Sequence, residues 1–577
     1  MLTLPKIEEE PGLNDFPVLY WNHVGLEMNR ITHSLGGPQS GPTMSSRALG
    51  LLHLAMHDAY FAVLGTGAPY PIYLPNNECP VLPAGVNASL VNANVALTAA
   101  AITILDHLYK NGGAGISIEA NETLTSALSK AIADYQPEIP TLSDAHGFGQ
   151  AIAEAIFARL GVKQGDIGAD AGRYEPKQGK YKFRDEPVNP LRRPSIDPNN
   201  PSRGTRAQRL YHGPFYGTTV KDFAVTDPDG HTLAPPPSGD AAYLQALIEV
   251  IELGGAPGQS KTKRTPDQTV AALYWAYDGA NLIGTPPRLY NQIVRVIAWN
   301  RSLPAATTLA RTSEFVRLFA LVNTALADAG KYAWKEKYRY EFWRPLTGVR
   351  EHDEASGLRP EKAGGNFHLD CDADPFWIAL GAPETNTNKI SFKPPFPAYP
   401  SGHATFGAAA LQMTRLFYKC DPATADDIGF RFVSEELNGT SRDLHAPFDP
   451  GVPLEDQPGI IRTRVVRRFK SLWQAIFENG LSRIYLGVHW NFDAFDVKDL
   501  HGAGYQNAEA VTYSHVWMKK RTDKNRPIGG VPLGLGIAND IFANNMKAPQ
   551  PAAVSAQNTP VGAKAPEPAK SSYTGIR

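Results

Sequence analysis

The sequence predicts a mainly α-helical protein, built as two helical bundles with long connecting loops. Apolar residues recur at helical spacing along most of the 577 residues. There is no run of alternating strands and no internal repeat with a period of roughly 20–50 residues. A chain of this length can bury a sizeable core. We therefore expect an N-terminal bundle over residues 1–250 and a C-terminal bundle over residues 260–530.

Composition narrows the class of protein. The 56 lysines and arginines balance 57 aspartates and glutamates, which leaves a net charge of -1 and argues against a broadly basic nucleic-acid binder. Three cysteines exclude a disulfide framework, although they permit one bridge. The N-terminus, MLTLPKIEEEPG, lacks the basic and apolar regions of a conventional signal peptide. We expect a soluble protein, with its localisation and oligomeric state left open.

The N-terminal half contains three strongly helical segments. Ser45–Leu64 is apolar on most faces, which is typical of a core helix, and Asn87–Tyr109 and Ser143–Leu160 are similar. Ser143 is a candidate N-cap. The longest charge-free stretch overlaps the second of these segments, but proline, glycine and asparagine interrupt it, so we expect no membrane span. Residues 185–240 are rich in proline, glycine, asparagine and arginine, and predict a long irregular connection.

Helical periodicity returns in the C-terminal half and stops before the end of the chain. The expected helices are Pro266–Gly279, Glu314–Lys337, His403–Tyr418, Arg467–Leu486 and Ala503–Lys519. Residues 547–577 are rich in alanine, proline, serine and lysine and poor in apolar residues, which predicts a disordered tail.

The first segment that could carry chemistry joins Lys337 to Arg344 and Pro345. The two cations are seven residues apart, so they can share a helix face if the helix continues that far. Pro345 favours an extended conformation at Arg344 and an end to the helix nearby. Taken alone, the segment is better explained as a solvated helix end than as a functional site.

The second segment is Pro400-Ser401-Gly402-His403, placed just before a helix of small residues. Exposed backbone N–H groups and the positive end of the helix dipole make such a position suitable for an oxyanion. Gly402 lets the anion approach the backbone closely, and His403 can donate to it. The simpler interpretation is an ordinary serine N-cap beside a surface histidine.

The third segment contains Arg483, His489 and Asp493. His489 and Asp493 are four residues apart, so on a helix the carboxylate would orient the imidazole. A pair of this kind is often purely structural. The presence of all three segments in one chain changes that interpretation. If Lys337, Arg344 and Arg483 converge in the interior, three buried cations without a partner would be strongly destabilising. One bound multivalent oxyanion is the simplest explanation, whereas a non-catalytic scaffold leaves the cations unexplained.

These three motifs together resemble the superfamily that unites vanadium-dependent haloperoxidases with bacterial acid phosphatases and phosphatidic-acid phosphatases. Longer segments resemble the vanadium chloroperoxidases first known from fungi, and the similarity extends from about Tyr20 to Asp523. These segments are YWNHVGLEMNRITH at Tyr20, ALGLLHLAMHDAYF at Ala48, YWAYDGANLIGTPPRLYNQIV at Tyr274, EFWRPLTGVR at Glu341 and PPFPAYPSGHATFG at Pro394.

The resemblance implies one vanadate cofactor per chain and a role for each motif residue. His489 would be the single protein ligand to vanadium, and His403 would deprotonate hydrogen peroxide. The residues expected to hold the vanadate oxygens are Lys337, Arg344, Ser401, Gly402 and Arg483, with His403 hydrogen-bonding the axial oxygen.

The resemblance also assigns residues around the vanadate. Asp278 would pair with Arg483, and Lys337 would polarise the bound peroxide. Trp334 and Phe396 would line the halide pocket. Bromide-preferring algal relatives tend to carry histidine at the position of Phe396, so this residue favours chloride without excluding bromide. The expected product is hypohalous acid, which halogenates small organic acceptors.

A phosphohydrolase is the alternative from the same superfamily. In that case the site would bind phosphate, His489 would attack phosphorus and His403 would protonate the leaving group. The flanking segments favour the haloperoxidase.

Overall fold

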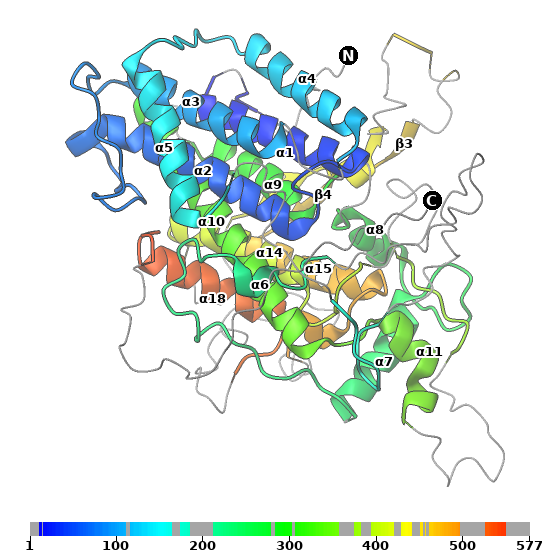
Figure 1. Ribbon diagram of the computed structural model, residues 1–577. Helices are drawn as coiled ribbons and strands as arrows, with labels where there is room; N and C mark the ends of the chain where they lie inside the picture. The colour runs from blue at the N-terminus through cyan, green and yellow to red at the C-terminus, as the bar shows by residue number, and fades with distance from the viewer. Residues whose placement is uncertain are drawn as a thin grey trace, which may run out of the picture.

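The structure is a computed structural model, and its description covers residues 11–13, 15–110, 116–163, 174–184, 212–239, 241–277, 283–302, 306–356, 374–381, 394–420, 428–440, 451–453, 456, 461–496 and 526–549. The expected mainly α-helical fold is confirmed (Figure 1). Strands in the described part are short and form two antiparallel pairs. β1 (Phe430–Phe432) pairs with β4 (Arg467–Phe469), and β2 (Asn438–Thr440) pairs with β3 (Ile461–Arg464).

The N-terminal helices form on apolar runs, and a serine side chain caps the start of three of them. They are α1 (Pro17–Leu35), α2 (Pro42–Leu64), α3 (Leu90–Tyr109), α4 (Ile118–Asp134) and α5 (Asp144–Leu160), with the short η1 (Gly65–Gly67) after α2. The predicted cap at Ser143 is confirmed, since its side chain accepts the His146 N–H. Ser89 and Ser117 cap α3 and α4 in the same way. α2 begins three residues earlier than expected, with Pro42 in its first turn.

The irregular connection over 185–240 is described only from residue 212 onward. Within that part, α6 (Tyr216–Thr219) is a single turn. The buried Asp328 carboxylate accepts the backbone N–H groups of three consecutive residues, Phe223, Ala224 and Val225. These bonds hold the connection against the centre of the molecule.

The C-terminal half supplies the longest helix and its partners. The elements are α7 (Ala241–Gly254), α8 (Pro266–Tyr274), α9 (Pro286–Arg301), α10 (Thr308–Tyr340), α11 (Pro345–Ser356), α14 (Gly402–Phe417), η3 (Glu435–Leu437), α15 (Leu472–Tyr485), η5 (Asn491–Asp493) and α18 (Gly530–Ala543). The prediction of one helix over Arg467–Leu486 is wrong at its start. Residues Arg467–Phe469 pair with β1, and the helix begins after Ser471, whose side chain caps it.

Two further expectations concern residues that are described partly or not at all. The helix expected over Ala503–Lys519 lies outside the described residues. Of the tail over 547–577, only residues 547–549 are described.

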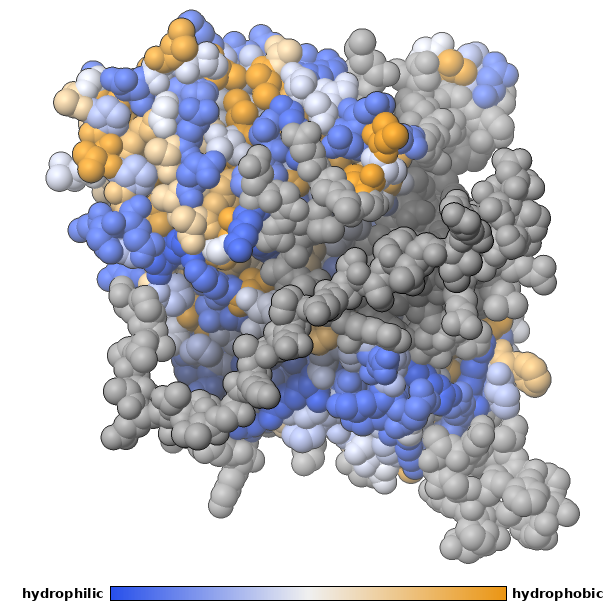
Figure 2. All heavy atoms as spheres, viewed as in Figure 1, coloured by the Kyte–Doolittle hydropathy of each residue, from blue (hydrophilic) through white to orange (hydrophobic). Residues whose placement is uncertain are grey.

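A continuous hydrophobic core runs through both halves, and α10 lies at its centre. α10 packs against α2 of the N-terminal half and against α14 of the C-terminal half, so one helix contacts both halves (Figure 1). α2 and α3 are long and apolar enough to cross a membrane, but 83% and 56% of their most apolar windows are buried within the protein. The face drawn in Figure 2 mixes hydrophobic and hydrophilic side chains over the N-terminal helices and is mostly hydrophilic below them.

Candidate functional site

The three predicted cationic segments meet in the interior, where the end of α10, the start of α14 and the end of α15 come together. Lys337, Arg344 and Arg483 are 0%, 0% and 1% exposed. Each of these cations lowers the pKa of His403 and of His489, so all three lie near the same two histidines. The predicted convergence is therefore present in the fold.

Lys337 and Arg344 do not share a helix face. α10 ends at Tyr340, and Glu341 follows in the left-handed region with φ of 51°. Arg344 lies beyond the helix, directly before Pro345 starts α11. The expected end of the helix before Arg344 is thus observed, and Arg344 lies outside regular secondary structure.

Lys337 Nζ lies against the loop that leads to the PSGH motif. It donates to the carbonyl oxygens of Pro397 and Ala398, both at 2.9 Å, and to that of Pro400. Its ammonium group is 5.5 Å from the ring centre of Trp334 and 5.2 Å from that of Phe396. Burial lowers the pKa of Lys337 well below its usual value, and the positive charges of the arginines lower it further.

Ser401 and Gly402 form the N-terminus of α14, as the sequence predicted. Ser401 is the N-cap, and its hydroxyl accepts the Ala404 N–H at 3.3 Å. The Ser401 N–H donates to the backbone oxygen of Asp493 at 2.8 Å, which ties the second motif to the third. A Cβ on Gly402 would lie 3.1 Å from Trp334, so a side chain here would press on the aromatic wall.

His489 is held by the predicted carboxylate, and a 3-10 helix, not an α-helix, brings the two side chains together. Asp493 ends the 3-10 helix η5, and its Oδ2 lies 2.7 Å from His489 Nδ1. The Asp493 carboxylate accepts the proton of Nδ1, so the lone pair of the imidazole is on Nε2. That nitrogen lies 3.1 Å from Arg344 Nη1 and therefore faces the cations.

His403 is held both at its imidazole ring and at its own backbone carbonyl. Its Nε2 lies 2.5 Å from the carbonyl oxygen of Ala276, which requires a proton on Nε2 and leaves the lone pair on Nδ1. Its own carbonyl oxygen accepts from Tyr290 Oη at 3.0 Å and from Asn479 Nδ2 at 2.9 Å. The ring is therefore fixed in a single tautomer.

Both site histidines are neutral. Burial lowers the pKa of His403 and of His489 well below the usual value, and the surrounding cations lower both further. Burial raises the pKa of Asp493 to about 7, against the opposing effect of Lys337. The site therefore combines an excess of buried positive charge with two neutral imidazoles, which is the environment that a multivalent oxyanion would stabilise.

A small cavity opens onto these groups. Its lining residues are Pro42, Pro286, Trp334, Pro394, Phe396, Gly402, His403, Phe406, Arg483 and His489. Trp334 and Phe396 lie side by side, with ring centres 4.8 Å apart, and give it an apolar wall. Both histidines, one cation and both predicted halide-pocket residues thus border one space. Asp278, the predicted partner of Arg483, lies outside the described residues.

Sequence reasoning missed several residues around the site. The carbonyl oxygen of His212 accepts from Trp334 Nε1 at 3.0 Å, so the irregular connection reaches the cavity wall. Asn479 lies four residues before Arg483 on α15, and a buried amide at this spacing was an available signal. Ala276 acts through its backbone carbonyl, which no residue type encodes.

Comparison with known proteins agrees with this geometry. Residues 4–222 match the family described as the vanadium chloroperoxidase N-terminal domain, and residues 317–528 match its second helical-bundle domain. The chain is 44% identical to vanadium chloroperoxidase from Curvularia inaequalis over 601 aligned residues, which cover 97% of this chain and 95% of that protein.

Two solved bacterial structures share the fold. The first bacterial vanadium-dependent iodoperoxidase gives a TM-score of 0.53 at 17% identity, covering 94% of this chain and 98% of that one. An apo-type bacterial vanadium-dependent chloroperoxidase gives a TM-score of 0.50 at 14% identity, covering 90% and 97%. At these identities the structures bear on the fold alone. Because it is 44% identical to the Curvularia inaequalis enzyme over nearly its whole length and matches both family domains, the chain belongs to the vanadium chloroperoxidase family.

Proposed function

We propose that this chain is a vanadium-dependent haloperoxidase that oxidises halide with hydrogen peroxide to hypohalous acid. The observation that carries the proposal is the buried site itself, where three cations surround two neutral histidines of opposite tautomer. The near full-length similarity to a vanadium chloroperoxidase supports the same activity. The acceptors of the hypohalous acid are proposed to be small organic compounds.

The donor set fits vanadate. Lys337, Arg344 and Arg483 supply positive charge, and the α14 N-terminus supplies Ser401 and the Gly402 amide. His489 Nε2 carries a lone pair directed at the same space, which suits a single protein ligand to vanadium. When bound, vanadate supplies a Lewis acid that activates peroxide without changing its own oxidation state.

The protein's own side chains are proposed to accept the peroxide proton and to supply positive charge. His403 is proposed to accept a proton from hydrogen peroxide at Nδ1, the nitrogen that carries its lone pair. Lys337 is proposed to supply positive charge next to the reacting oxygen. Asp278 remains the proposed partner of Arg483.

We propose chloride as a substrate, with bromide also accepted. The support is the apolar wall of Trp334 and Phe396, over which the cations Lys337 and Arg344 lie. An apolar pocket beside positive charge can hold a halide anion. Replacing Phe396 with histidine should lower the ratio of chlorination to bromination rates, and an unchanged ratio would remove this residue from halide selection.

A phosphohydrolase remains the second candidate, because the neutral His489 facing the cations is also suited to attack phosphorus. The two functions separate in one experiment on protein freed of vanadate. Monochlorodimedone chlorination with peroxide and chloride should appear only after orthovanadate is added. Hydrolysis of p-nitrophenyl phosphate at a higher rate than any halide oxidation would favour the phosphohydrolase instead.

For the whole chain, we propose a soluble enzyme with an N-terminal bundle over 1–250 and a C-terminal bundle over 260–530. The matched family domains, at 4–222 and 317–528, support this division. The proposed site then belongs to the C-terminal bundle, with α10 carrying Trp334 and Lys337.

A further inference from the structure

The peptide group between Ala276 and Tyr277 is held from both sides. Its carbonyl oxygen lies 2.5 Å from His403 Nε2, and its N–H donates to Glu436 Oε1 at 3.1 Å. One rigid peptide unit therefore connects a buried carboxylate to the proposed base. Glu436 is 2% exposed, so this contact is shielded from water.

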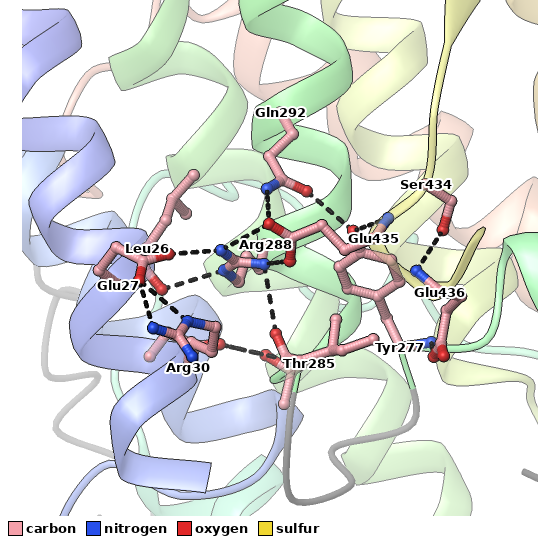
Figure 3. A network of polar contacts seen from close by, with 12 residues as sticks. Leu26, Glu27, Arg30, Tyr277, Thr285, Arg288, Gln292, Ser434, Glu435 and Glu436 are labelled. Atoms are coloured by element: carbon pink, nitrogen blue, oxygen red, sulfur yellow. Dashed lines mark hydrogen bonds and ion pairs between the residues drawn. The ribbon is translucent and has the colours of Figure 1, made fainter. Parts of the chain in front are cut away.

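The backbone at this point is strained and is held by a dense polar network. Tyr277 has φ of 34°, which is unfavourable for a residue with a side chain. Its hydroxyl donates to Gln292 Oε1 at 3.0 Å and accepts the Glu435 N–H at 3.0 Å (Figure 3). Glu435 in turn pairs with Arg288, a buried cation on α9. The conformation that presents the Ala276 carbonyl is thus fixed by several elements.

The segment that carries Glu436 is itself fixed. The Glu436 N–H donates to Ser434 Oγ at 3.3 Å, and that hydroxyl donates to the backbone carbonyl oxygen of Tyr274 at 2.7 Å. Figure 3 shows Glu436 next to Tyr277, close to the ion pairs of Arg288. The carboxylate therefore reaches the peptide from a rigid support.

We propose that Glu436 is a positioning residue for His403 and acts through the Ala276–Tyr277 peptide. Its carboxylate orients the peptide N–H, which turns the carbonyl on the other side of the same plane toward His403 Nε2. The carbonyl then keeps the proton on Nε2 and the lone pair on Nδ1. This inference rests on the proposed function for its catalytic meaning, but the tautomer of His403 is a property of the protein alone.

The test measures that tautomer in vanadate-free protein by ¹⁵N NMR of labelled histidine. The His403 signals are assigned by their loss in His403→Gln. Wild-type protein should show protonated Nε2 and unprotonated Nδ1. Glu436→Ala removes the acceptor for the peptide N–H, so the His403 nitrogens should move toward averaged values. Glu436→Gln keeps an acceptor oxygen at the same reach and should retain the wild-type pattern.

Two further variants keep the test decisive. Glu436→Asp withdraws the acceptor by one methylene and should loosen the tautomer even if the alanine variant does not fold. Asp328→Ala removes a buried carboxylate that also accepts backbone N–H groups, but those of residues 223–225, and should leave the His403 signals unchanged. Wild-type signals in both Glu436→Asp and Glu436→Ala would overturn the proposal, as would an equal shift in Asp328→Ala.

Kinetics provides the second measurement. With vanadate bound, Glu436→Ala should lower kcat/KM for hydrogen peroxide by about tenfold to a hundredfold, the range usual for groups that orient a reactive side chain. Vanadate affinity should change little, and Glu436→Gln should restore the rate. If no variant and no wild-type protein oxidises halide, the proposed function fails while the NMR result still decides the positioning role.

Discussion

At the scale of single residues, the two buried histidines experience the same cations but have opposite tautomers. Asp493 holds the proton on Nδ1 of His489, and the Ala276 carbonyl holds it on Nε2 of His403. The lone pairs are therefore on different nitrogens. This difference gives one imidazole the geometry of a ligand and the other that of a base.

Replacing His403 with alanine should separate catalysis from binding. We expect kcat/KM for hydrogen peroxide to fall by about 10²- to 10⁴-fold, as for loss of a general base. Vanadate affinity, measured by calorimetry, should fall much less. A parallel loss of both would contradict the assigned role. His489→Ala is the matched variant, because it should lose vanadate binding itself.

Asp493→Ala tests the anchor of the proposed ligand. Without the carboxylate, the His489 ring loses its preferred tautomer, and we expect vanadate affinity to fall by about tenfold to a hundredfold. The same variant removes the acceptor for the Trp490 N–H, so stability must be measured alongside. Unchanged affinity in a folded Asp493→Ala protein would show that the pair is only structural.

At the scale of elements, the position of α14 depends on close packing against α18. A Cβ on Gly534 would lie 2.2 Å from the Thr405 oxygen and 2.8 Å from the Ala409 nitrogen. Gly534→Ala therefore has to push α18 away from α14, and should destabilise the protein by about 1–3 kcal/mol in chemical denaturation. Gly147→Ala, on α5 with nothing within 4 Å, is the control and should stabilise slightly. Equal effects of the two substitutions would contradict this account of the packing.

The sequence predicted elements well where local signals decide them. Serine caps and apolar periodicity located α5, α14 and much of α10. The prediction failed at Arg467–Phe469, because pairing with the distant β1 outweighs local helical spacing. For His489 and Asp493 the spacing indicated that the two side chains would meet on a helix, and the contact is instead made by a turn and a 3-10 helix.

At the scale of the whole molecule, buried neutral histidines couple stability to pH. Burial lowers the pKa of His33 to about 4, and its Nε2 accepts the Gly41 N–H at 2.7 Å. In the unfolded chain His33 takes up a proton as the pH falls below about 6.5, whereas in the folded chain it stays neutral down to about pH 4. The neutral, buried His33 therefore makes its full contribution to folding stability only above pH 6.5. This contribution is lost as the pH falls from 6.5 towards 4.

His33→Gln should therefore change the pH dependence of unfolding. Buried aspartates with raised pKa values, such as Asp328 at about 7, act in the opposite direction and obscure the wild-type curve. The difference in free energy of unfolding between wild type and variant at each pH isolates the contribution of His33. Between pH 6.5 and 4, that difference should shrink by up to about 1.4 kcal/mol per pH unit as the pH falls. Parallel curves would show that His33 titrates equally in both states.

The overall arrangement of the site was predictable only in part. Residue types and their order indicated that Lys337, Arg344 and Arg483 converge. Their partners were not predictable, because Lys337 and His403 are oriented by backbone carbonyls contributed by distant segments. Such contacts depend on how the chain is folded and not on which side chains it carries.

The most direct test of the central claim is anomalous diffraction at the vanadium absorption edge from crystals reconstituted with orthovanadate. The account predicts one strong peak per chain within bonding distance of His489 Nε2, surrounded by Lys337, Arg344 and Arg483. No peak there, or a peak bound to other residues, would contradict it.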